Sequence, residues 1–184
     1  MRAEGTITIR SCSTGARVYV IRGPGTFDWA VATLHDETGL VAIVSDHGDW
    51  AHAWNPRHIS EPSLHHFVAR ADASYAADKM LHRADDSEVD IKGTRRAVFE
   101  RIIRDRREMS ISKEVARERW DEIIDWDEDD YHEHILPGDE WLSDAYEYIA
   151  YRPTATAKAF MEIVWPSVQR AVREELARRQ WAEL

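Results

Sequence analysis

The sequence predicts an α+β fold in which an N-terminal antiparallel β-sheet of four to five strands precedes a C-terminal helical region. Three observations lead to this prediction. Short runs of β-branched and aromatic residues, separated by turns that contain Gly, fill residues 6–54. Beyond residue 60, apolar residues recur at the three- and four-residue spacing of amphipathic helices. The turns in the first part are short enough for hairpins, which pair strands in antiparallel fashion.

Five runs supply the expected strands, and each ends at a turn signal. The strands are predicted at residues 6–10, 17–21, 29–35, 40–45 and 49–54. In the stretch SDHGDWAHAW, which ends at Trp54, Gly48 is expected to turn the chain with a positive φ. Trp50 and Trp54 should then share one face of the returning strand, because side chains alternate along a strand.

Helical spacing begins after Pro56. Ser60, Asp72 and Ser112 are expected to cap three helices, because their side-chain oxygens can accept hydrogen bonds from the free N–H groups of a first turn. The last helix is predicted to begin near Thr154 and to be kinked or split at Pro166, which has no backbone donor. Its expected buried face consists of Phe160, Ile163, Val164, Val168, Val172 and Leu176.

A polar stretch at residues 83–91 is the expected linker between two parts of the chain. Residues 1–82 should hold the sheet and two short helices. Residues 92–184 should form a helical region that packs with the first part as one compact unit. A chain of 184 residues is long enough to bury a core without help from disulfides or metals.

Composition excludes several classes of protein. Cys12 is the only cysteine, which excludes an internal disulfide and a Cys-rich zinc module. The N-terminus lacks the apolar segment of a signal peptide, and no run of residues approaches the length of a membrane span. These features predict a cytoplasmic protein that has no contact with a membrane.

The net charge of −10 is distributed unevenly. Residues 121–147, called the acidic segment below, contain twelve Asp or Glu and no Lys or Arg. The rest of the chain therefore carries a small positive net charge. Residues 92–107 hold seven bases against two acids. Such segregation of charge predicts attraction to an oppositely charged surface.

We expect the acidic segment to be the functional site, because repulsion between its carboxylates is a cost that a basic partner surface would remove. Aromatic residues within the segment are suited to anchor such an interface. The predicted partner-binding residues are Asp125, Trp126, Asp127, Glu128, Asp129, Asp130, Tyr131, Glu133 and Trp141. No catalytic residue, metal site or cofactor is predicted.

Two alternatives remain open. A metal-assisted hydrolase could use Asp46, His47, Asp49 and His52, although their spacing matches no zinc motif. A nucleic-acid binder could use the basic helix at residues 92–107, although the acidic total disfavours direct binding to phosphates.

One pattern is shared with a known group of proteins. It combines a Ser-Asp-x-Gly-Asp-aromatic turn, a following Trp, a helix that contains Phe and an Asp-x-x-Tyr segment. The residues that carry it are Ser45, Asp46, Gly48, Asp49, Trp50, Trp54, Phe67, Asp72 and Tyr75. In this respect the run from about residue 29 to 81 resembles a family of small accessory proteins encoded by bacteriophages and prophages. The resemblance implies a phage protein inside a bacterial host cell, and it brings no catalytic residues.

With this resemblance, the acidic segment predicts a phage-encoded interaction protein that binds a host macromolecule. A bacterial defence complex that normally grips nucleic acid is the partner that fits best, because carboxylates can occupy a basic groove as phosphates do. The protein would then act as an inhibitor that mimics DNA, in the manner of anti-CRISPR proteins.

Overall fold

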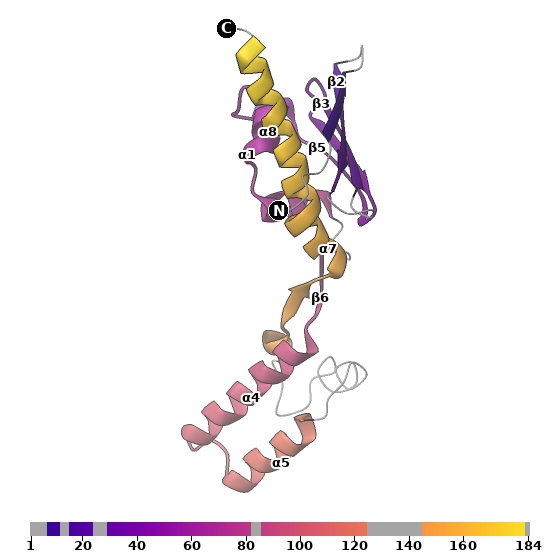
Figure 1. The fold of residues 1–184 in the computed structure, drawn as a ribbon. Coiled ribbons are helices and arrows are strands. Elements are labelled where there is room, and N and C mark those ends of the chain that lie inside the picture. Colours follow the sequence, from indigo (N-terminus) through magenta and orange to yellow (C-terminus); the bar gives the residue numbers. More distant parts are fainter. Residues whose placement is uncertain (1–6, 12–14, 24–28, 82–85, 125–144, 183–184) are drawn as a thin grey trace. The chain divides into compact units, whose positions relative to one another are not determined.

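The computed structural model describes residues 7–11, 15–23, 29–81, 86–124 and 145–182. The chain forms two compact units, drawn in Figure 1. The first unit comprises Met1–Asp86 and Pro153–Leu184, and the second comprises Ser87–Arg152. The sequence suggested a break at residues 83–91 with everything after it in one helical region. In the structure the end of the chain instead returns to the first unit.

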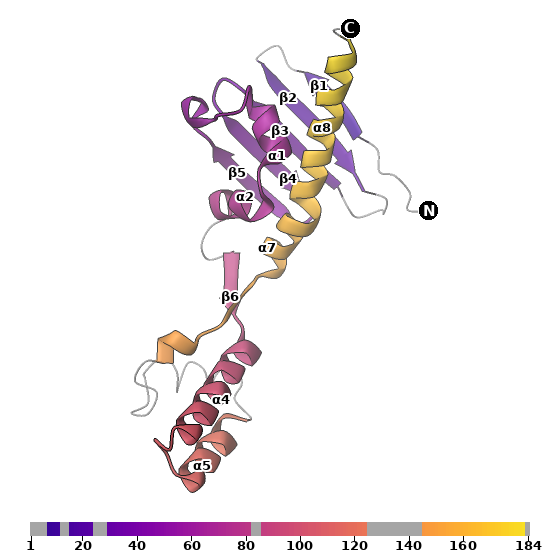
Figure 2. The same cartoon turned by 90° about the vertical axis from the view of Figure 1, so that its left-hand side faces the viewer.

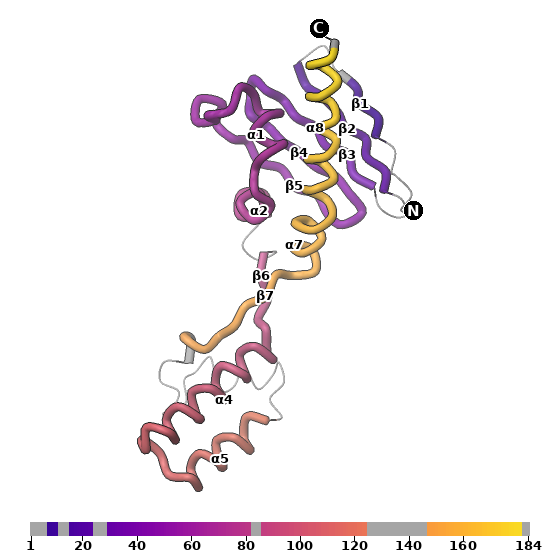
Figure 3. Tube along the Cα trace, turned by 60° about the vertical axis from the view of Figure 1, so that its left-hand side comes forward, coloured from indigo at the N-terminus to yellow at the C-terminus, as the bar shows by residue number. Residues whose placement is uncertain are grey.

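The first unit contains a five-stranded antiparallel sheet, as the sequence predicted. Figure 3 shows the strands side by side in the order β1-β2-β3-β4-β5. Each strand pairs in antiparallel fashion with the strand that follows it in the sequence, so the sheet is a simple meander. The strands are β1 (Ile7–Ser11), β2 (Ala16–Arg22), β3 (Trp29–His35), β4 (Leu40–Ser45) and β5 (Gly48–Ala53).

Three helices cover one face of this sheet (Figure 2). They are α1 (Leu64–Arg70), α2 (Ala73–Met80) and α8 (Trp165–Ala182), and the short turn η1 (Pro56–His58) precedes them. Asp72 caps α2 by accepting hydrogen bonds from the N–H groups of Ser74 and Tyr75, which confirms the predicted cap. The predicted cap at Ser60 is wrong, because α1 begins only at Leu64 and Ser63 accepts from the N–H of His66.

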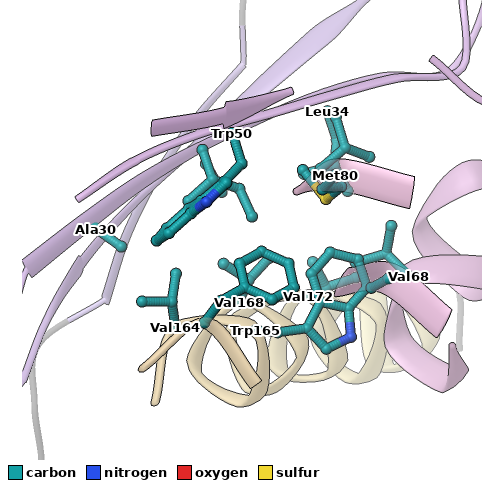
Figure 4. Packing of buried hydrophobic residues seen from close by; sticks show 14 of the residues in the cluster. Ala30, Leu34, Trp50, Val68, Met80, Val164, Trp165, Val168 and Val172 are labelled. Atoms are coloured by element: carbon teal, nitrogen blue, oxygen red, sulfur yellow. The ribbon is translucent and has the colours of Figure 1, made fainter. Parts of the chain in front are cut away.

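The main core lies between the sheet and these helices. Figure 4 shows Trp50 of β5 facing the side chains of Val164 and Val168 from the C-terminal part of the chain. The rings of Trp50 and Phe160 meet edge to face, with centroids 5.0 Å apart. Trp165 is fully buried, and its Nε1 donates to the carbonyl oxygen of Ala71 at 3.2 Å. Burial of large apolar side chains of this kind is the main source of stability for the unit.

The last helix is one helical run with a widened turn inside it. It begins with α7 (Ala155–Ala159), which confirms the predicted start near Thr154, and the Thr154 side chain accepts from the N–H of Ala157. It continues through the π-helical turn η4 (Phe160–Val164) and extends as α8. Pro166 lies in the first turn of α8, where a proline is tolerated, so the helix is not split at this residue. The interruption is instead the π-helical turn, which ends two residues before Pro166. Of the predicted buried face, Ile163 is 41% exposed, because the widened turn rotates it outward.

The second unit contains two long helices and a pair of short strands. The helices are α4 (Ile91–Arg107) and α5 (Lys113–Ile123), and the strands are β6 (Ser87–Val89) and β7 (Tyr151–Pro153), with the turn η3 (Ala145–Tyr148) before β7. Its core is small and consists of Val98, Ile102 and Ile123, with half-buried side chains around them. Ser112 caps α5 as predicted. The expectation of an almost wholly helical second half was wrong for β6 and β7, because three residues are too few to show a strand period.

Within the described part of the chain, no helix combines the length and the apolar character that a membrane crossing requires.

Candidate functional site

The nine residues predicted to bind a partner lie outside the described residues, within the stretch 125–144. They are Asp125, Trp126, Asp127, Glu128, Asp129, Asp130, Tyr131, Glu133 and Trp141. The structure does describe both ends of the acidic segment. Asp121 and Glu122 at the end of α5, and Glu147 in η3, are all exposed. None of these three forms an ion pair with another described residue.

A groove between α4 and α5 lies beside the beginning of the acidic segment. It has a volume of about 580 Å³ and an apolar floor that includes Ile103 and Trp120. Arg106, Arg107 and Arg117 line its rim. The ring of Trp120 stacks on that of Phe99 at a centroid distance of 4.0 Å, which fixes its position. The second unit therefore presents aromatic and arginine side chains together, a combination that is enriched in protein interfaces.

The basic helix of the nucleic-acid alternative is α4. Two of its bases are held by acids one turn away, because Arg96 donates to Glu100 at 3.0 Å and Arg101 pairs with Asp105 at 2.7 Å. Arg101 also donates to the hydroxyl of Tyr148 at 2.8 Å. These contacts use donors that a phosphate backbone would otherwise engage.

The stretch SDHGDWAHAW is a hairpin turn followed by β5. Gly48 has a φ of +144°, which confirms the predicted positive φ. Ser45 holds the turn, since its Oγ donates to the Gly48 carbonyl at 3.0 Å and accepts from the His47 N–H at 3.1 Å. Trp50 and Trp54 both belong to the main core, so the prediction that they share one face is also confirmed.

The four residues of the hydrolase alternative do not converge. Asp49 is exposed on one face of β5, whereas His52 lies on the other face with its ring 4.6 Å from that of Trp54. Asp46 Oδ1 lies 3.7 Å from His47 Nε2, and these two residues are in the turn. No group of three or more His, Cys, Asp or Glu within the described ranges is placed to hold a metal ion.

A buried polar network that the sequence reasoning missed joins β2 to α8. Glu175 of α8 is only 7% exposed and accepts hydrogen bonds from the Tyr19 hydroxyl and the Arg17 guanidinium. Arg179 donates to the same carboxylate at 2.6 Å. Burial raises the pKa of Tyr19 above its ordinary range, so the phenol keeps its proton and remains a donor.

The network has a signal in the sequence. Arg17 and Tyr19 alternate with apolar residues on β2, so they share its inner face. Glu175 follows Val168 and Val172 at helical spacing on the buried stripe of α8. A carboxylate inside an apolar stripe indicates a buried cationic or hydroxyl partner.

A second contact joins the buried His65 of α1 to Asp36 in the β3–β4 turn, whose side chain is 43% exposed. The Nδ1 of His65 lies 3.0 Å from a carboxylate oxygen of Asp36, and Asp36 also accepts from the N–H of Leu64 at 3.0 Å. The Nε2 of His65 is buried and has no hydrogen-bond partner among the described residues. Burial lowers the pKa of His65 although Asp36 opposes this shift, so the ring is neutral in the fold. Because the His65 side chain is closed off from solvent, its role is structural.

Comparison with known protein families gives a match over most of the chain. The sequence matches the phage family Phage_phiTE_072 over residues 7–174. No curated protein and no solved structure matches the chain. The family match extends well beyond the run from 29 to 81 on which the resemblance was based, and it covers both structural units. The chain therefore belongs to this phage family.

Proposed function

We propose that the protein is a phage-encoded interaction protein that binds a basic surface of a host macromolecule through its acidic segment. The observation that carries the proposal is the run of twelve acids without a Lys or Arg between residues 121 and 147. Membership of a phage family supports a role in the infected cell. The exposure of Asp121, Glu122 and Glu147 supports a segment whose ends face solvent.

The physical reason lies in the balance of charge. Carboxylates at this density repel one another, and the repulsion weakens the free protein unless opposite charge is nearby. A basic partner surface would turn this cost into an attraction and would raise the association rate at low ionic strength. Trp126, Tyr131 and Trp141 would add the apolar contacts that charge alone does not provide.

The partner we propose is a bacterial defence complex that binds nucleic acid. Such a complex has a groove built to neutralise phosphates, and a chain of carboxylates presents the same sign of charge at similar density. Occupation of that groove would exclude the nucleic acid, so the phage protein would act as an inhibitor. Trp120 in the α4/α5 groove would supply an apolar contact beside the acidic segment.

The test reverses the charge of four consecutive acids. Changing Asp127, Glu128, Asp129 and Asp130 to Lys should leave the fold intact and abolish capture of the partner from a host lysate. The same variant should lose any protection that the protein gives to an infecting phage. A matched control reverses four exposed acids elsewhere and so changes the net charge equally. The control residues are Glu37, Glu108, Glu118 and Glu162.

The control variant should retain both partner capture and protection. Capture should also weaken as salt is added, because the attraction between the two surfaces is screened. Partner binding that survives reversal of residues 127–130, or that is lost equally in the control variant, would refute a specific role for the acidic segment.

A further inference from the structure

The sheet of the first unit has two faces, and helices cover one of them. Figure 1 shows α1 and α8 on the same side of the strands. The side chains that point the other way form what we call the outer face. Within the first unit, no described helix packs against the outer face, and Val44 of β4 on this face is 45% exposed.

The outer face is apolar where an antiparallel sheet that faces water is usually polar. Paired residues cross it in rows. One row runs through Thr8, Val20, Val31, Val44 and Asp49. The next row runs through Arg10, Val18, Thr33, Ala42 and Ala51. A contiguous apolar patch of this kind, bordered by charge, marks an interaction surface.

The charges on the outer face lie at opposite edges. Arg10 on β1 and Arg22 at the end of β2 are both exposed, whereas Asp49 is exposed on β5. Between the two arginines lies a hollow of about 310 Å³, whose lining also includes Thr8 and Val20. Asp49 stands in the same row as Thr8, four strands away.

We propose that the outer face binds a second copy of this chain, with the two sheets stacked face to face about a two-fold axis parallel to the strands. This axis places β5 of one copy over β1 of the other and keeps the rows at the same level. Asp49 of one copy then meets the row of Thr8, where it enters the hollow between Arg10 and Arg22. The symmetry repeats the contact at the other edge.

Two orientations of a two-fold axis can stack the outer faces, one parallel and one perpendicular to the strands. The charges favour the parallel axis. An axis perpendicular to the strands would place β1 over β1, so the arginines of the two copies would face each other. It would also leave Asp49 opposite the β5 edge of the partner copy. Like charges brought together in an interface strongly disfavour that arrangement. The parallel axis instead pairs every edge charge with its opposite.

The face is large enough for a weak dimer. Five strands at a spacing of about 4.8 Å, each with about six residues at about 3.4 Å, give a footprint of about 500 Å² per copy. Two copies would therefore bury about 1,000 Å² in total, which meets the minimum of about 1,000 Å² for a biological interface and suits a weak dimer. Val18, Val20, Val31 and Val44 would form its apolar centre.

The test measures the molar mass of the full chain by light scattering and sedimentation over a wide range of protein concentrations. The wild-type protein should dimerise. Asp49→Arg should weaken dimerisation at least about 100-fold, because it sets like charges against Arg10 and Arg22. Adding Arg10→Asp and Arg22→Asp to this variant should restore the dimer. Glu37→Arg is the matched control, since it makes the same charge change in the exposed β3–β4 turn and should leave the dimer unchanged.

Circular dichroism and thermal unfolding establish that each variant is folded. The triple variant is the decisive comparison, since recovery of the dimer is expected only if residue 49 of one copy directly contacts residues 10 and 22 of the other. A wild-type chain that is monomeric at every concentration would overturn the proposal. So would a dimer that survives both Asp49→Arg and Val44→Asp, because association would then use another surface. A folded triple variant that stays monomeric would overturn the pairing of the edge charges.

Discussion

Replacing Gly39 by Ala should destabilise the first unit far more than the same change at Gly15, although both glycines have a positive φ. Their φ values are +67° and +78°, so the backbone strain added by a Cβ is similar at the two positions. That strain costs about 1–2 kcal/mol. The surroundings differ, and the difference between the two variants isolates the contribution of contacts.

At Gly39 the added Cβ would lie 1.7 Å from the carbonyl oxygen of Trp54. The obstacle is backbone, and it cannot rotate away as a side chain could. Trp54 also donates its N–H to the Gly39 carbonyl at 3.0 Å, so relief of the clash would break this hydrogen bond. Strain, clash and the lost bond together predict a loss of about 3–5 kcal/mol.

Gly48 should fall between these two cases. Its φ of +144° lies outside the left-handed helical region, and a Cβ would meet the ring of Trp50 at 2.9 Å. The ring cannot move freely because it packs against Phe160 in the core. We expect Gly48→Ala to cost about 2–3 kcal/mol. At Gly15 nothing lies within 4 Å of the added atom, so only backbone strain remains.

Urea unfolding followed by circular dichroism and by tryptophan fluorescence gives the free energy of unfolding for each variant. The expected order of destabilisation is Gly15→Ala, then Gly48→Ala, then Gly39→Ala. Equal losses at Gly39 and Gly15 would refute the reasoning, because they would mean that the Trp54 carbonyl does not approach Gly39. A loss at Gly48 no greater than at Gly15 would show that the Trp50 ring yields without cost.

Two further predictions concern buried titratable groups. Burial lowers the pKa of His65 from its ordinary value of 6.5, so the fold favours the neutral ring. The free energy of unfolding should therefore be highest above about pH 7 and should fall as the pH drops through 6.5 toward the lowered pKa, because only the unfolded state then binds the proton. Urea midpoints of the wild type and of His65→Gln across this pH range measure the effect. The loss due to His65 should occur in the wild type and be absent from the variant. Glu175→Gln should cost about 1–3 kcal/mol, since it leaves Arg17 and Arg179 without their carboxylate while both remain partly hydrated. Glu174→Gln, the control one residue earlier, should cost under about 0.5 kcal/mol, and equal losses in the two variants would contradict a special role for Glu175.

The order of elements could be predicted because it rests on local patterns. Alternation and turn glycines marked all five strands of the sheet, and Asp72 and Ser112 capped helices where short polar side chains precede apolar spacing. Local patterns failed where distant contacts decide. The pair β6 and β7 forms between segments about sixty residues apart, and neither strand has a period of its own.

The candidate site divides in the same way. Charge is additive along a sequence, so the acidic segment is evident without any structure. The contact of Glu175 with Tyr19 depends on how α8 lies on the sheet, and no spacing within either segment specifies it. The hydrolase alternative shows the converse, because Asp49 and His52 are close in sequence but odd spacing sends them to opposite faces of β5.

The same alternation gives an independent reason to expect a cover for the outer face of the sheet. An antiparallel strand with one wet face reads as alternating apolar and polar residues, whereas a strand buried on both faces reads as continuously apolar. The runs VYVI at 18–21 and LVAIV at 40–44 are of the second kind. The helices of the first unit cover Tyr19, Ile21 and Ile43, but Val20 and Val44 from the same runs lie on the outer face. A face that stays exposed to solvent would gain nothing from β-branched apolar residues, and these residues would make it prone to nonspecific association. The charges lie toward its two edges and are opposite in sign, with Asp49 in the row that runs between Arg10 and Arg22. This arrangement favours a single specific occupant, and a second copy of the same sheet has the matching charges where they are needed.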